Sequence, residues 1–175
     1  KEVEDVLEEL DRLIETWARL NRELVERIRR LLEEWREENR KVVEEVRRSN
    51  ETLRELVERG VPKEDIRRLA KEDNERIEEL LKRSRKIADD IRRAIEEIVR
   101  RSREILRELE KRVDDKLRVE EVVRRVKDKL REVKREVEET ARELRERVDD
   151  LLRKVEESVT RLKRHNEDLL REVER

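Results

Sequence analysis

Apolar residues recur at helical spacing over almost the whole chain, and this periodicity constrains the fold most. One row of positions spaced by seven contains Leu7, Ile14, Asn21, Ile28, Trp35, Val42, Ser49 and Leu56. A second row runs beside it and slips by one residue midway: Val3, Leu10, Trp17, Leu24 and Leu31, then Asn39, Val46 and Leu53. Two such rows predict a long amphipathic helix, and the slip predicts a nearly straight one with little supercoil.

The only glycine and the only proline lie together in ERGVPKED, residues 58–65. Gly60 suits the left-handed position just past a helix end, and Pro62 suits the first turn of the next helix. Glu64 and Asp65 would place negative charge at the positive end of that helix. The first helix is therefore expected over about 1–59, and the second is expected to begin at 63.

A second break is predicted near residues 113–118, where the rows spaced by seven change phase. Before it they contain Ala70, Ile77, Ser84, Ile91, Ile98 and Ile105, and after it Val123, Leu130, Val137, Leu144, Leu151, Ser158 and His165. We expect Asp114 or Asp115 to cap the third helix. The same Asp pair occurs in IADDIRR and RVDDLLR, where the rows stay in phase. The alternative is therefore one helix of over a hundred residues with a stutter.

The expected fold is all-α, an up-down-up three-helix bundle of long, nearly straight helices. The helices are expected over about 1–59, 63–112 and 117–175, in one elongated domain spanning residues 1–175. The composition is typical of a coiled coil, because 58% of the residues are charged, with a net charge of -1. Such idealised bundles often melt above about 90 °C, and we expect the same here.

Composition also excludes several classes of function. The chain has no Cys, which excludes disulfides and thiolate chemistry, and it has no apolar run of about 18 residues to cross a membrane. No signal peptide opens it, and acids match bases throughout, unlike a nucleic-acid surface. We expect no enzyme activity, cofactor, metal, nucleic acid, membrane or small-molecule partner, and the localisation is left open.

Polar residues interrupt the apolar rows at regular intervals, and they are the candidate site residues. Eighteen residues separate Trp17 from Trp35, Asn21 from Asn39, Ser84 from Ser102, and Thr140 from Ser158. Eighteen residues make five helical turns, so the two members of each pair lie on one face of their helix.

Residues at equal height in an antiparallel hairpin have numbers with a constant sum. That sum is 123 for three polar pairs, and half of it falls in the loop of residues 60–62: Asn21 with Ser102, Asn39 with Ser84, and Ser49 with Asn74. We expect Asn21 to be buried beside Leu20 and Leu24, with Ser102 as its partner, and Trp35 to face Ala88. A paired buried amide adds little stability but penalises slipped registers. The rival hypothesis is a ligand cavity near Trp17 or Trp35.

The third helix fits this scheme in two ways. If the second loop centres near residue 116, Ser158 is level with Asn74 and Ser49, and Thr140 bonds only to its own helix. If it centres near 121, Thr140 lies beside Asn21. The first version is preferred because its loop chemistry fits better.

Asn50, His165 and Asn166 complete the candidate set, with His165 and Asn166 in a polar layer near the C-terminus. A metal site is not indicated, because there is no second His and no Glu-x-x-His pair. If His165 is buried, its protonation makes that end of the bundle sensitive to acid near pH 5 to 6.

The chain has more apolar residues than a strict two-in-seven pattern needs. Five flank the rows: Val25, Leu32, Val43, Val57 and Val99. They either widen a three-helix core or mark an exposed stripe for self-association or for a partner helix.

These features resemble de novo designed helical bundles with buried hydrogen-bond networks. The resemblance rests on the GVPKED loop, on surfaces filled with Glu and Arg, and on apolar rows interrupted by Asn21, Asn39, Ser49, Asn74, Ser84, Ser102 and Ser158. The segment RVDDKLRVEE departs from it as a less typical loop. The resemblance implies a structural scaffold or helical assembly module whose polar layers specify register and pairing. The alternatives are a ligand-binding bundle, or a subunit of an oligomer that supplies a fourth helix.

Overall fold

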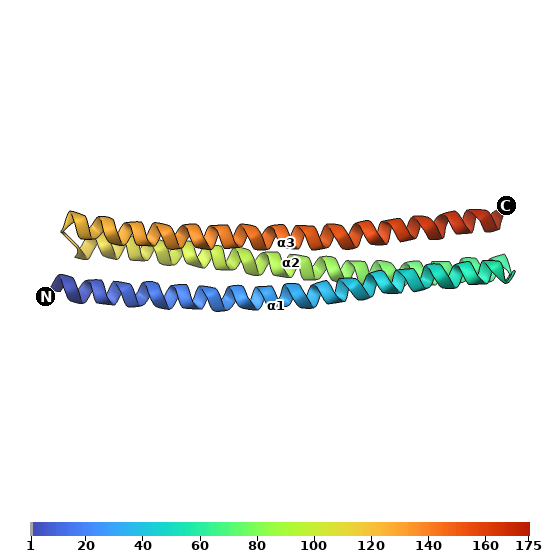
Figure 1. Ribbon diagram of the computed structural model, residues 1–175, viewed down its shortest axis with the longest axis horizontal. Helices are drawn as coiled ribbons and strands as arrows, with labels where there is room; N and C mark the ends of the chain where they lie inside the picture. The colour runs from blue at the N-terminus through green and yellow to red at the C-terminus, as the bar shows by residue number, and fades with distance from the viewer. Residues whose placement is uncertain (1) are drawn as a thin grey trace. The chain divides into compact units, whose positions relative to one another are not determined.

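The protein consists of three long α-helices joined by two short loops in a computed structural model that describes residues 2–175. The helices are α1 (Glu2–Glu58), α2 (Lys63–Lys116) and α3 (Glu120–Glu174), and the described residues contain no strand (Figure 1). The predicted all-α fold of three helices is confirmed.

Two backbone hydrogen bonds from the first loop cap the C-terminal end of α1. Gly60 has a φ of 73°, its amide donates to the carbonyl of Val57 at 3.1 Å, and the amide of Val61 donates to Leu56 at 3.2 Å. These are the bonds of a Schellman motif, in which a left-handed glycine satisfies the last carbonyls of a helix. The carbonyl of Pro62 then accepts the amide of Ile66 at 3.2 Å. The predicted role of Gly60 is confirmed.

The second loop differs from the prediction. Asp114 and Asp115 lie inside α2, which ends at Lys116 instead of 112, and α3 begins at Glu120 instead of 117. Neither Asp therefore caps α3. The helix continues because Val113 and Leu117 are core residues, and the amide of Leu117 donates to the carbonyl of Val113 at 3.0 Å. The single helix with a stutter is also excluded, since residues 117–119 are not helical.

Residue contacts divide the chain into two compact units, and each helix contributes a segment to both. Unit 1 contains Lys1–Leu31 and Ile91–Arg147, and unit 2 contains Leu32–Asp90 and Val148–Arg175. The expectation of one domain stays a prediction.

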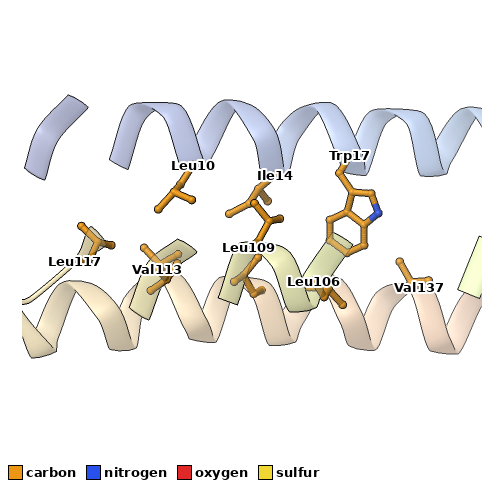
Figure 2. Packing of buried hydrophobic residues seen from close by; sticks show 10 residues of the cluster. Leu10, Ile14, Trp17, Leu106, Leu109, Val113, Leu117 and Val137 are labelled. Atoms are coloured by element: carbon orange, nitrogen blue, oxygen red, sulfur yellow. The ribbon is translucent and has the colours of Figure 1, made fainter. Parts of the chain in front are cut away.

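Much of the core of unit 1 is an apolar cluster from all three helices. Its buried members are Leu10, Ile14, Trp17, Leu106, Leu109, Val113, Leu117, Val126, Leu130 and Val137. Figure 2 shows the indole of Trp17 extending from α1 toward Leu106 of α2. Unit 1 is thus held mainly by apolar burial.

Unit 2 has two smaller apolar clusters. One contains Val42, Val46, Ile77, Leu81, Val155 and Val159, and the other contains Leu53, Ile66 and Ala70. Both clusters again take residues from all three helices, because Leu169, Leu170 and Val173 of α3 pack against the second.

Contacts between helices give the chain direction within each unit. Ion pairs between α2 and α3 join residues whose numbers sum to 241, in unit 1 Arg103–Glu138 and Asp114–Lys127, and in unit 2 Arg67–Glu174, Glu78–Lys163 and Arg85–Glu156. A constant sum means that α2 and α3 are antiparallel. Contacts between α1 and α3 keep a nearly constant difference instead, in Asp11–Lys129 of unit 1 and Asn50–Asn166 of unit 2. In unit 2 the contacts Asn39–Ser84 and Ser49–Asp73 between α1 and α2 also keep a nearly constant sum, 123 and 122, so α1 is antiparallel to α2 and parallel to α3 there.

Burial repeats every eighteen residues along α2, whereas the rows spaced by seven stay buried for only part of their length. Each buried residue from Ile66 to Val99 has a buried counterpart eighteen positions later: the set is Ile66, Ala70, Asp73, Ile77, Leu81, Ser84, Ala88, Ile91, Ile95, Val99, Ser102, Leu106, Leu109, Val113 and Leu117. In a straight helix, positions spaced by seven rotate by about 20° per heptad around the helix axis. Rows spaced by seven therefore leave the core at their ends, and Ile105 is 36% exposed.

The same drift explains why apolar residues occur beside the rows spaced by seven. Val25, Leu32 and Val99 are buried, and Val43 and Val57 are half-buried, so they widen the three-helix core. Instead, Leu20 of α1, expected to be buried, is 52% exposed, and Leu31 is 45% exposed.

Candidate functional site

Three buried side chains of unit 2 form a chain of hydrogen bonds between α1 and α2. The indole Nε1 of Trp35 donates to Ser84 Oγ at 2.9 Å, and the Ser84 hydroxyl donates to Asn39 Oδ1 at 2.5 Å. Trp35, Asn39 and Ser84 are at most 6% exposed. Asn39 and Ser84 are the pair that the sum of 123 predicts. The sequence reasoning missed the bond from Trp35, although Trp35 precedes Asn39 by one turn on the same face.

A second contact in unit 2 replaces one predicted pair. Ser49 donates to Asp73 Oδ2 at 2.6 Å, whereas the predicted partner, Asn74, is only half-buried. Asp73 also accepts from Arg76 Nη2 at 3.2 Å, and Arg76 Nε lies 2.7 Å from Glu45. These contacts compensate the buried charge of Asp73. The sequence does contain a signal for its burial, because the apolar residues Ile91 and Leu109 follow Asp73 at intervals of eighteen.

A third contact joins α1 to α3 in unit 2. Asn50 Nδ2 donates to Asn166 Oδ1 at 2.8 Å, and Asn166 is 2% exposed. His165, predicted to share this layer, is exposed instead. Asn166 follows the core residue Val148 by eighteen, whereas the row spaced by seven that leads to His165 has rotated out of the core. The condition for an acid-sensitive His165 is therefore not met.

Two buried side-chain amides have a nitrogen that donates no hydrogen bond. Asn39 Nδ2 and Asn166 Nδ2 have no hydrogen-bond partner among the described residues of the protein. A buried donor without an acceptor costs about 1 to 3 kcal/mol. These contacts therefore reduce stability compared with a fully satisfied network.

The corresponding residues of unit 1 are not joined in this way. Asn21, predicted to be buried, is half-buried, and Ser102 is 4% exposed. No hydrogen bond connects Asn21 with Ser102 in the part of the chain that the structure describes, residues 2–175. Trp17 is 5% exposed and lies in the apolar cluster.

The two remaining candidates lie on α3, and both are half-buried: Thr140 and Ser158. The α2–α3 sum of 241 is the register of the second version, so the preferred version has the wrong register, although the loop itself, residues 117–119, lies between the two predicted centres. Within unit 1, Thr140 is level with Arg101, next to Ser102, as the second version had it. In unit 2, Asn166 replaces Ser158 in the layer that contains Ser49 and Asn50.

Charged side chains surround the core mostly as local pairs on the surface. Hydrogen bonds from Arg40 to Glu37, and from Arg100 and Arg101 to Glu97, lower the pKa of the two carboxyl groups. A hydrogen bond from Lys154 is the main cause that lowers the pKa of Asp150. Exposed pairs of this kind contribute little to stability.

Lys163 of α3 is partly buried and forms an ion pair with Glu78 of α2. Burial lowers the pKa of the Lys163 ammonium, and the negative charge of Glu167 acts in the opposite direction. The ion pair with Glu78 lies within unit 2 and has the same register as the other α2–α3 pairs.

Residues 2–175 contain no cluster of three His, Asp or Glu side chains placed to hold a metal ion. None of the described helices has an apolar stretch long enough to cross a membrane.

Comparison with solved structures finds proteins of similar fold. No family model matches the chain, and no curated protein matches it. A solved structure described as "Computationally designed three helix bundle" is similar at 17% sequence identity and a TM-score of 0.41. The similarity covers 97% of this chain and 86% of that chain.

Proposed function

We propose that the chain is a designed structural scaffold or helical assembly module without enzymatic activity, in which buried polar contacts set the register of the helices. The observation that carries this proposal is the set of side-chain hydrogen bonds in unit 2, which link α1 to α2 and α1 to α3. Asn39, Ser84, Asn50 and Asn166 are all nearly inaccessible to solvent.

The physical basis of the proposal is the cost of separating these groups inside a core. A slip of one helix by a turn keeps much of the apolar burial but leaves the amides opposite aliphatic side chains. Each buried group left unpaired then costs about 1 to 3 kcal/mol. A buried polar contact can therefore select one register even when its own net contribution is small.

The two loops indicate where this selection matters most. Gly60 and the Schellman bonds fix how α1 and α2 connect. The second loop, Leu117 to Val119, has neither Gly nor Pro. The height of α3 therefore depends more on side chains, and Asn50–Asn166 is the buried polar contact that holds α3 to α1 in unit 2.

The experiment measures distances between spin labels on α1 and α3. The chain has no Cys, so the exposed Arg48 and Arg164 of unit 2 can be changed to Cys and labelled. The labelled chain is diluted into an excess of unlabelled chain, so that only distances within one molecule are measured. We expect one narrow distance in the parent protein, and a broader or second distribution after Asn50→Leu with Asn166→Leu.

A label pair on α1 and α2 is the matched control. Cys at Arg48 and at Lys71, both exposed in unit 2, reports the register that the Gly60 loop fixes. This distance should stay narrow in the same Leu variant. If the α1–α3 distance also stays narrow, the buried amides do not set the register of α3.

A further inference from the structure

Unit 1 has a strip of partly exposed leucines on one side of α1. We define the leucine strip as Leu13, Leu20, Leu24 and Leu31, which lie within about 40° of arc at 100° per residue. Leu20 is 52%, Leu31 45% and Leu13 37% exposed. The spacings of seven, four and seven place the four leucines in two neighbouring rows on one face of the helix.

Two isoleucines of α2 continue the apolar surface at the same height. Ile98 is half-buried and Ile105 is 36% exposed. Ile98 and Leu24 have numbers that sum to 122, and Ile105 and Leu20 have numbers that sum to 125. Both sums are close to 123, the sum for the contact between Asn39 of α1 and Ser84 of α2. The strip and the isoleucines therefore lie side by side along unit 1.

The corresponding side of unit 2 is polar. Five turns further along α1, Ser49 follows Leu31 and Glu38 follows Leu20. The surface there is lined by charged and hydroxyl groups, among them Glu44, Arg48, Ser49 and Arg76. The exposed apolar strip is thus confined to unit 1 and is not a general property of the helices.

The charges that border the strip indicate its occupant. Glu9 and Glu23 lie along its outer edge on α1, and Arg101 and Arg112 lie along the outer edge of the isoleucines on α2, all four exposed. Glu9 is level with Arg112, and Glu23 with Arg101, because the number sums are 121 and 124. At these two heights the α1 edge of the apolar surface is therefore acidic and the α2 edge is basic.

From these observations we infer that the strip binds a second copy of this chain about a twofold axis parallel to the helices. Such an axis exchanges the two edges, so the acidic edge of each copy meets the basic edge of the other. Arg27 of α1 and Glu97 of α2 have numbers that sum to 124 and make a further complementary pair. At this height the basic residue is on α1 and the acidic residue is on α2. The leucines of both copies then lose their contact with water.

This inference deepens the proposed assembly role and rests on it. Its readout is the mass in solution, whereas the register proposal is tested by a distance within one molecule, so the two can fail separately.

The first experiment measures absolute mass by light scattering over a hundredfold range of concentration. We expect a transition from 21.7 kDa to twice that mass. Leu20→Glu with Leu31→Glu changes exposed positions and should raise the dissociation constant by at least about a hundredfold, since each buried leucine accounts for about tenfold or more. Val119→Glu is the control, because Val119 is 50% exposed but lies outside the strip. Helicity measured by circular dichroism should not change in either variant.

The second experiment tests the axis by reversing charges. Glu23→Arg alone and Arg101→Glu alone should each weaken the dimer by about threefold, as expected for exposed ion pairs. Mixing the two variants should restore the parent affinity, because each altered residue then meets its complement in the other chain.

Three outcomes would overturn the inference. They are a mass of 21.7 kDa at every concentration, a dimer that Leu20→Glu with Leu31→Glu does not weaken, and a mixture that binds no better than the single variants. Association of the strip only with an added leucine-rich helix, and not with itself, would assign it to a different partner.

Discussion

Units 1 and 2 are built from the same three helices with the same interval of burial, yet they are held by different interactions. In unit 1 an apolar cluster surrounds Trp17. In unit 2 the equivalent Trp35 donates a hydrogen bond to Ser84, and polar contacts accompany the two smaller apolar clusters. The difference teaches that one helical geometry accepts either kind of core, because the interval fixes which positions are buried and not what fills them.

The largest predicted effect comes from joining the two units at equivalent positions. Deleting residues 21–38, 85–102 and 139–156 removes five turns from each helix and keeps every buried position in phase. We expect a shorter chain that remains helical and unfolds cooperatively, measured by circular dichroism during heating. The deletion places Trp17 one turn before Asn39, the position that Trp35 has in the parent protein. Trp17 should then donate a hydrogen bond to Ser84 as Trp35 does.

A deletion of sixteen residues from each helix is the control. Removing 21–36, 87–102 and 139–154 rotates the remaining halves of each helix by about 160° at 100° per residue. This chain should lose cooperative unfolding. Equal stability of the two shortened chains would contradict the five-turn interval.

A core truncation tests whether the units unfold separately. Leu130 of unit 1 is 0% exposed, and Leu130→Ala should lower the free energy of unfolding by about 2 to 5 kcal/mol. We expect hydrogen exchange to accelerate by the same factor for the most protected amides of both units, because each helix is continuous through both. Acceleration confined to unit 1 would show that the units are separate domains.

The buried amides of unit 2 should give a non-additive pair of effects. Asn50→Leu or Asn166→Leu alone should cost about 1 to 3 kcal/mol, because each leaves a buried amide without its partner. Both together should cost less than either, because two apolar groups then meet. Chemical denaturation of the four proteins gives the coupling free energy. Simple additivity would mean that the two amides do not interact.

The smallest predicted effect is the response to acid. The pKa values of Glu37, Glu97 and Asp150 are lowered by hydrogen bonds from Arg40, Arg100 and Lys154. A lowered pKa stabilises the folded state at neutral pH, and this contribution is lost as pH falls through the lowered value. The melting temperature should therefore stay level from about pH 8 to 5 and fall only below about pH 4. A fall in the melting temperature already near pH 6 would contradict this prediction.

The sequence predicted the helices because the apolar spacing and the loop chemistry agree with each other. Gly60 has the backbone conformation that only glycine adopts readily, so the first loop could be placed to within about one residue. Leu117, by contrast, becomes buried by extending α2 through Asp114 and Asp115, and this gain depends on packing against other helices. Local capping preferences do not contain that information.

The polar contacts were predicted where the chosen rows still faced the core. Asn39 and Ser84 lie near the middle of their rows, and the structure joins them. Asp73 and Asn166 were missed as partners, and His165 and Leu20 were placed wrongly, because a row spaced by seven rotates steadily away from the core. The interval of eighteen, visible in the sequence between the Trp, Asn and Ser pairs, describes all four positions better.

The second loop has a practical consequence for how the protein could be divided. Residues 117–119 connect α2 to α3 without a glycine, a proline or an aspartate cap. Cutting the chain at Arg118 would turn α3 into a separate peptide and the α1–α2 hairpin into its receptor. Asn166 would then determine the position at which the peptide binds, since Asn50 of the hairpin donates a hydrogen bond to it.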